Sequence, residues 1–175
     1  MISLRCTLLL AGWVILLPGC SNETETELPI AGVHRGSDND AQRLYNRAQA
    51  ADKSGRDKKA TSLYSGTADK YPHSRIAAAA RFRQAQLLHQ QGKLDAAFEI
   101  YQMVISRYQA SSLYTQARDS QAKVAHAAAE GSVTGKLLWF KPDLDIKKVV
   151  SMLETVRDNA PRAPSAAKAQ HAIGK

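Results

Sequence analysis

The sequence has little cysteine, few aromatic residues and no long apolar run after residue 20. Its 175 residues include two cysteines, Cys6 and Cys20, and 6% aromatic residues. Two cysteines are too few for the framework of several disulfides that stabilises many small exported domains. We therefore expect the fold to be stabilised by packing alone.

The sequence also lacks any recognisable arrangement of catalytic or metal-binding residues. The five histidines at positions 34, 73, 89, 126 and 171 are scattered, and no pair has the helical spacing of metal ligands beside an acidic partner. There is no glycine-rich phosphate loop and no serine in a nucleophile elbow. His89 is expected to be a surface or turn residue. The sequence thus predicts a protein that is not an enzyme and binds no metal, cofactor or small-molecule substrate.

The first 19 residues have the features of a secretory signal. Met1–Arg5 carries one positive charge, and the stretch from Cys6 to Leu17 is almost wholly apolar. Twelve helical residues extend about 18 Å, well short of the roughly 30 Å hydrocarbon core of a bilayer. A basic start followed by a short apolar run favours a signal peptide over a transmembrane helix.

The end of this segment resembles the lipobox of bacterial lipoproteins. In Leu17-Pro18-Gly19-Cys20, Leu17 and Gly19 match the pattern and Pro18 departs from it. The resemblance implies lipidation of Cys20, cleavage before it, and anchoring by two or three acyl chains, which hold a protein stably at a membrane. Ser21 favours the outer membrane under the sorting rule of these lipoproteins. An ordinary signal peptide or an uncleaved anchor is the alternative.

Charge is distributed unevenly along the rest of the chain. Residues 21–40 hold five acids and one base, whereas residues 41–175 hold 22 bases and 11 acids. Residues 20–40 are polar, contain Pro29, Gly32 and Gly36, and are expected to form the lipidated N-terminus and a flexible tether. Export excludes nucleic acid as a partner, so the basic part suits anionic lipid or acidic protein segments. A solvated basic surface with no partner is the alternative.

Residues 41–110 contain an internal repeat with a step of 37 residues. Small, glycine and aromatic positions coincide after this shift: Ala48 with Ala85, Gly55 with Gly92, Ala60 with Ala97, Tyr64 with Tyr101, and Tyr71 with Tyr108. We expect the alanines to lie where two antiparallel helices cross. We expect the glycines to end the first helix of each repeat in a left-handed conformation. Tyr64 and Tyr101 are expected to fill the groove between helices.

The repeat resembles the tetratricopeptide repeat (TPR) and predicts an all-α solenoid of helical hairpins. Two features depart from the TPR pattern: the step is 37 residues instead of 34, and the early aromatic position of the first helix holds Leu44 or Arg81. Tyr71-Pro72-His73-Ser74 marks a junction, where proline ends one helix and Ser74 is expected to cap the next. Residues 107–111 are a degraded copy of that junction.

The 37-residue step divides the chain into repeats 41–73, 74–110 and 111–161 and a partial repeat 162–175. The third contains an insertion, 131–145, between expected helices Ser112–Glu130 and Ile146–Asn159. The apolar stretch Leu137–Phe140 within it either contacts a partner or folds back on the solenoid. The fourth repeat stops after its first helix, so the sequence is expected to be part of a longer protein. A terminal capping helix is the alternative.

The lipobox, the tether and the 37-residue repeats with Tyr-Pro-x-Ser junctions together resemble the BamD (YfiO) family of outer-membrane assembly lipoproteins. This resemblance implies a lipid-anchored scaffold on the periplasmic face of the outer membrane. Its partners would be envelope proteins of the β-barrel assembly machinery. It identifies no binding residues beyond the lipidation site, Cys20.

Three other functions stay open. A generic TPR lipoprotein of pilus biogenesis or of cell-division and peptidoglycan coordination is the main alternative, although such proteins tend to keep a 34-residue step. A purely structural envelope protein and a peptidoglycan-active enzyme are the others. A partner, if there is one, is expected to bind shallow contacts on a helical face.

Overall fold

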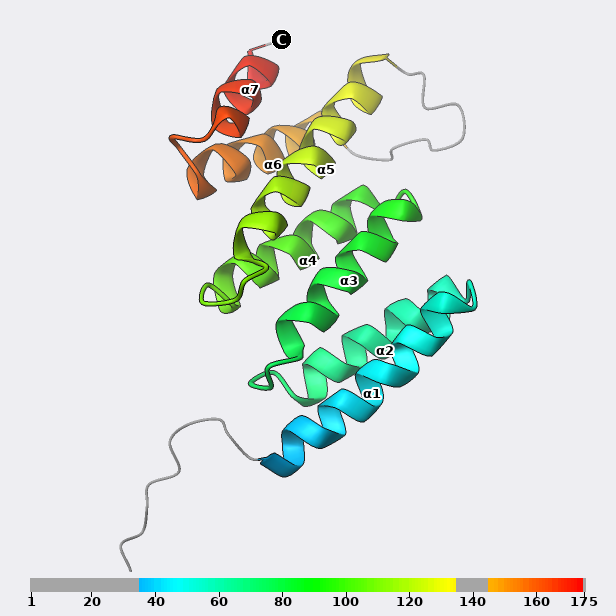
Figure 1. The fold of residues 1–175 in the computed structure, drawn as a ribbon. Helices are drawn as coiled ribbons and strands as arrows, with labels where there is room; N and C mark the ends of the chain where they lie inside the picture. Colours follow the sequence, from blue (N-terminus) through cyan, green and yellow to red (C-terminus); the bar gives the residue numbers. More distant parts are fainter. Residues whose placement is uncertain (1–34, 135–144, 175) are drawn as a thin grey trace, which may run out of the picture. The chain divides into compact units, whose positions relative to one another are not determined.

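The computed structural model describes residues 35–134 and 145–174, and within these ranges it contains helices and no strands. The helices are α1 (Arg35–Lys53), α2 (Asp57–Lys70), α3 (Ala77–Gln90), α4 (Leu94–Arg107), α5 (Tyr114–Thr134), α6 (Ile146–Asn159) and α7 (Pro164–Ile173). They form successive antiparallel hairpins, α1–α2, α3–α4 and α5–α6, and α7 packs against α6 and α5 (Figure 1). The predicted all-α solenoid of helical hairpins is confirmed.

Two glycines end the first helices of the first two hairpins as the sequence predicts. Gly55 and Gly92 have φ angles of 69° and 72°. At the first turn, Arg56 N donates to Ala51 O and Gly55 N donates to Asp52 O, both at 2.9 Å. The second turn repeats both bonds, 37 residues later. This is the Schellman arrangement, and it needs a left-handed residue that glycine supplies without strain.

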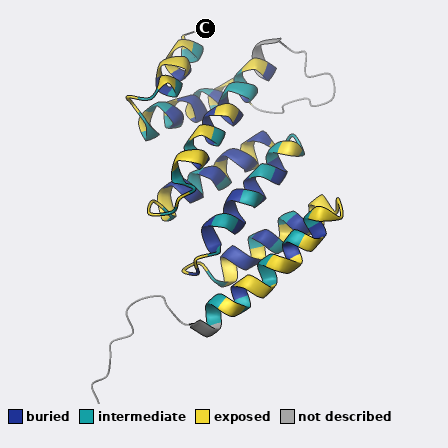
Figure 2. Ribbon diagram, in the orientation of Figure 1, coloured by how far each residue is buried: buried dark blue, intermediate teal, exposed yellow. Residues whose placement is uncertain are grey.

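The repeated alanines and tyrosines form the contacts between helices. The alanines at 48, 60, 85 and 97 are fully buried, and the tyrosines at 64 and 101 are only 1% exposed. Figure 2 shows buried residues along the helices of both hairpins. Small side chains let the helix backbones approach closely, and each tyrosine fills the space beside them. The predicted structural roles of these positions are therefore confirmed.

A repeated aromatic pair accounts for one departure from the TPR pattern. Tyr45 packs edge-to-face on Tyr64, with ring centroids 5.3 Å apart, and Phe82 packs on Tyr101 at 5.6 Å. Such pairs stabilise by about 0.5–1.5 kcal/mol beyond their burial. The large aromatic residue expected early in the first helix is thus present in both repeats, but one position later. Tyr45 follows Leu44, and Phe82 follows Arg81.

The buried residues form two clusters that meet at α3. The first cluster joins α1, α2 and one side of α3, and six of its eight members are alanine. The second extends from the other side of α3 to α7 and contains larger side chains, including Phe98, Val104, Met152 and Leu153. Helix α3 is therefore covered on both sides, which explains why it has few exposed residues.

Three sequence expectations need correction. Helix α1 begins at Arg35, inside the segment expected to be a tether, because Asp38 stabilises its first turn and Ala41 is fully buried. Ser74 is not a helix cap: it is buried, its hydroxyl has no hydrogen-bond partner, and the cap position of α3 is Ile76. Helix α5 continues to Thr134, past the expected end at Glu130.

The last two helices lie close to their expected positions. Helix α6 has the expected bounds, and Asp145 caps it by accepting a hydrogen bond from Lys147 N at 3.4 Å. Helix α7 covers most of the expected partial repeat. The apolar stretch Leu137–Phe140 of the insertion lies outside the described residues.

Candidate partner-binding surfaces

The predicted lipidation site and signal segment lie outside the described residues, so Cys20 stays a prediction. Within the described ranges, no helix is both long and apolar enough to cross a bilayer. Nor do those ranges hold a cluster of three or more His, Cys, Asp or Glu side chains that could bind a metal. Candidate sites are therefore surfaces formed by several helices.

The first surface is formed by α1, α3, α5 and α7, and we call it the first-helix face. A bidentate ion pair joins two of these helices: Arg83 Nε and Nη2 on α3 donate to the Asp52 carboxylate on α1, at 2.6 and 2.9 Å. The Tyr64 hydroxyl of α2 donates to the same carboxylate at 3.2 Å. Helices α1, α2 and α3 are thus joined by one polar network.

This network shifts the ionisation of all three groups. Hydrogen bonds from Arg83 lower the pKa of the Asp52 carboxyl, and the same contact raises the pKa of Arg83. Burial, with the neighbouring Asp52 charge, raises the pKa of the Tyr64 hydroxyl. At neutral pH the ion pair is fully charged, which fixes the relative position of α1 and α3.

Two histidines on the same face, His89 and His126, occupy the positions equivalent to Asp52 in the next two repeats. Burial is the main cause that lowers the pKa of His89, and the Lys123 charge on α5 lowers it further. Burial likewise lowers the pKa of His126, followed by the Lys168 charge on α7. Both imidazoles are therefore neutral at pH 7, and His89 is half-buried, not simply a surface residue.

Charges of both signs lie on the helices of the first-helix face. They include the acids Asp52, Asp119 and Glu130 and the bases Arg83, Lys123 and Lys168. Charge on this face does not by itself select an acidic peptide, and shape and hydrogen bonding would have to contribute to any partner's recognition.

A buried arginine cluster holds α2 and α3 together. The Arg81 residue is 7% exposed, and its guanidinium donates to Ser65 Oγ at 3.2 Å and to Gln84 Oε1 at 2.9 Å. It also forms an ion pair with Asp69 of α2. The sequence did not predict this role. The internal repeat indicated only that Arg81 occupies a position where an aromatic residue was expected.

Three side-chain amides join α4, α5 and α6. Gln102 Oε1 accepts hydrogen bonds from Gln121 Nε2 and from Asn159 Nδ2, both at 2.7 Å. Asn159 Nδ2 also donates to Gln121 Oε1 at 2.9 Å. Gln121 is 1% exposed, so these bonds compensate for burying a polar group. The third hairpin, which contains the insertion, is thus positioned on the second by a specific network.

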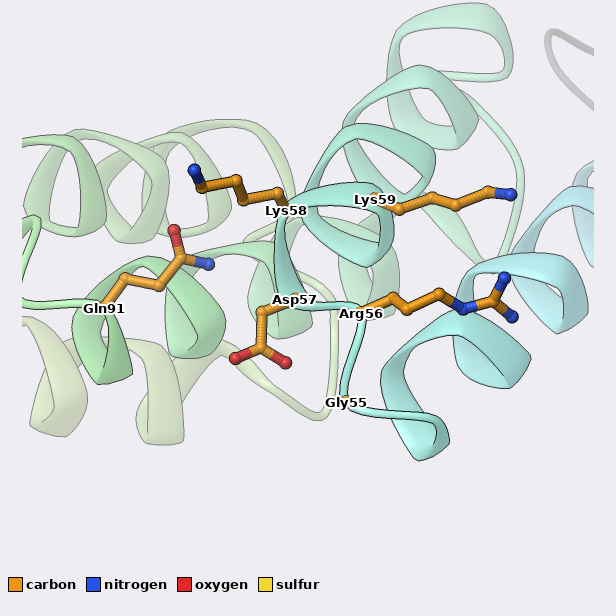
Figure 3. Close-up of a pocket in the computed structure, with 6 residues that line it drawn as sticks. All are labelled: Gly55, Arg56, Asp57, Lys58, Lys59 and Gln91. Atoms are coloured by element: carbon orange, nitrogen blue, oxygen red, sulfur yellow. The ribbon is translucent and has the colours of Figure 1, made fainter.

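The second surface lies at the turn between α1 and α2. A hollow of about 490 Å³ is lined by Gly55, Arg56, Asp57, Lys58, Lys59 and Gln91. Figure 3 shows Lys58 and Gln91 on one side of the turn, with Lys59 and Arg56 extending together on the other. Gln91, the residue directly after α3, donates to Thr61 Oγ1 of α2 at 3.2 Å and so keeps the two hairpin turns adjacent.

Comparison with known proteins identifies the repeat. A family model described as a tetratricopeptide repeat matches residues 79–111, which cover most of α3, all of α4 and the start of the following junction. No curated protein matches the chain. The family match and the helical hairpins together show a TPR-like solenoid, a fold that typically serves as a scaffold for contacts between proteins.

Proposed function

We propose that this protein is a lipid-anchored scaffold of the bacterial outer membrane that supports the assembly of β-barrel proteins, as BamD-like lipoproteins do. One observation carries the proposal: hairpins with a 37-residue step recur with the same turns, alanines and aromatic pairs. That step, together with the Tyr-Pro-x-Ser junction, is the pattern on which the resemblance to this family rests. The first-helix face is the proposed docking site for the partner.

A photocrosslinking experiment in cells tests the proposed partner. A photoreactive residue is introduced singly at Gln49, Gln86 or Lys123 on the first-helix face, and at the exposed Ser62 or Ser106 of α2 and α4 as controls. We expect one dominant product from the three face positions, containing a component of the β-barrel assembly machinery. The control positions should give little of it.

Other crosslinking outcomes distinguish the alternatives. A dominant product with a pilus or cell-division protein would support a generic TPR lipoprotein of another envelope system. Diffuse labelling from every position would support a purely structural envelope protein. Either result would refute the assembly role.

The proposed anchor at Cys20 has a separate test. Cells that express the full chain are grown with radioactive palmitate, and the chain is compared with a Cys20→Ser variant. We expect label in the original chain alone, and we expect it to fractionate with the outer membrane. Label retained after the substitution, or absent from both chains, would contradict lipidation at this residue.

A further inference from the structure

Unpaired positive charge is concentrated at the turns of the first two hairpins. Five exposed bases make up this group, which we call the cationic tip: Lys53, Arg56, Lys58, Lys59 and Lys93. Among the residues that the structure describes, none of the five forms an ion pair with a carboxylate. Asp57 is the one acid inside the tip's main stretch, 53–59.

Several bases elsewhere are paired with nearby carboxylates. Arg81 pairs with Asp69, Arg83 with Asp52, and Lys148 with both Asp95 and Glu99. Asp95, the acid closest in sequence to Lys93, is thus already paired with Lys148. The tip, with five bases and a single acid in its main stretch, thus keeps a net positive charge.

The tip is a protruding surface, and two contacts fix its shape. Gly55 and Gly92 close both hairpins with the same left-handed turn, so the two turns lie at the same end of the stack (Figure 1). The hydrogen bond from Gln91 to Thr61 connects the second turn to the start of α2. The bases of both turns therefore lie at one end of the stack, and those of the first turn extend to both sides of it (Figure 3). Figure 2 shows the first of these turns as exposed.

We propose that the cationic tip contacts the anionic headgroup surface of a lipid bilayer. Its composition favours lipid over a protein partner. Protein interfaces are depleted of lysine and depend on buried aromatic or arginine anchors, whereas four of the tip's five bases are lysine and the hollow beside it is lined by no aromatic residue. Lysines on flexible stems suit a diffuse layer of lipid phosphates, which needs no fixed geometry.

The contact orients the scaffold and adds to whatever attaches the chain to the membrane. Attraction to an anionic surface weakens about fivefold with each base removed, and it falls off within a Debye length, about 8 Å at physiological salt. With five bases, the tip would bind reversibly and would respond to ionic strength. Lipid contact by the tip is independent of the proposed role in β-barrel assembly.

Lysine acetylation followed by mass spectrometry tests the contact on the full chain. The chain is reconstituted into vesicles of zwitterionic lipid alone or with one-third anionic phosphatidylglycerol, and acetylation rates are measured for each lysine. We expect Lys53, Lys58, Lys59 and Lys93 to react at least about threefold more slowly in anionic vesicles, with recovery at about 0.5 M salt. The exposed Lys123 and Lys168 serve as internal references and should not change.

Two matched variants localise the effect. Lys58→Glu with Lys59→Glu should abolish the protection of Lys53 and Lys93, whereas Lys123→Glu with Lys168→Glu should leave it intact. Equal slowing of every lysine, or no slowing at all, would overturn the proposal. So would protection that appears when a soluble glutamate-rich peptide is added but not with anionic vesicles, because it would assign the tip to an acidic protein.

Discussion

At the scale of single residues, two glycines of the first hairpin have opposite roles. Gly55 has a φ of 69° and forms the left-handed turn, whereas Gly66 lies inside α2, where an added Cβ would meet no atom within 4 Å. Gly55→Ala should lower the free energy of unfolding by about 1 kcal/mol, because other residues are strained in this conformation. Gly66→Ala should raise it by about 0.5–1 kcal/mol, because alanine favours the helix.

Urea unfolding followed by circular dichroism checks both substitutions, and each variant is the control for the other. If Gly55→Ala were neutral, the turn would tolerate another conformation. If Gly66→Ala were destabilising, position 66 would have a packing role that its exposure does not indicate.

Arg81 gives a second prediction at this scale. Replacing a buried ion pair by apolar side chains is often neutral, whereas removing one partner leaves a charge uncompensated. Arg81→Met leaves only the Asp69 carboxylate, which is mostly exposed and stays hydrated, so the substitution should change the free energy of unfolding by less than about 1 kcal/mol. Asp69→Ala should lower it by about 1–2 kcal/mol, a reduced cost because the Asp69 side chain is 61% exposed.

The comparison of the two variants in urea unfolding is decisive. A larger loss from Arg81→Met than from Asp69→Ala would mean that the hydrogen bonds to Ser65 and Gln84, not the ion pair, stabilise the junction of α2 and α3.

At the scale of helices, the Asp52–Arg83 pair couples α1 to α3, and its contribution depends on pH. The folded pKa of Asp52 lies below its usual value of 3.8, so the pair stabilises fully above that value. The stabilisation is lost as pH falls through the lower folded pKa. A double-mutant cycle with Asp52→Asn and Arg83→Gln should give a coupling of about 1–2 kcal/mol at pH 7.

Measurements of stability against pH check this prediction. The difference between the original chain and Asp52→Asn should be constant from pH 7 to about pH 5 and should shrink below about pH 4. The Asp40→Asn variant is a control, since Asp40 is an exposed partner of Arg43 within α1. A difference that persists at pH 2 would show that the carboxylate charge is not the cause.

The helices themselves were largely predictable from the sequence, and the polar networks between them were not. Glycine, alanine and tyrosine recur at a fixed step because each satisfies a local steric requirement, so a shift of 37 residues detects them. The start of α1 was missed because its first turns are polar and lack apolar periodicity. The amides of Gln102, Gln121 and Asn159 meet only after three helices pack, and no spacing along the chain indicates this.

At the scale of the whole molecule, the two core clusters predict uneven stability along the described helices. In a repeat fold each hairpin is stabilised mainly by its neighbours. The cluster that holds α1 and α2 consists mostly of alanine, which buries little apolar area, whereas the cluster from α3 to α7 contains leucine, phenylalanine, valine and methionine. Hydrogen exchange should therefore be faster in α1 and α2 than in α4 and α5.

A matched pair of leucines separates local from global opening. Leu87 belongs to the first cluster and Leu153 to the second, and each is 1% exposed. Replacing either by alanine should cost about 2–5 kcal/mol. In hydrogen exchange followed by mass spectrometry, Leu87→Ala should speed exchange mainly in α1 and α2, and Leu153→Ala mainly in α5, α6 and α7. An equal increase throughout the described helices in both variants would mean that they unfold as one cooperative unit, in which α3 transmits the loss of either cluster to the other.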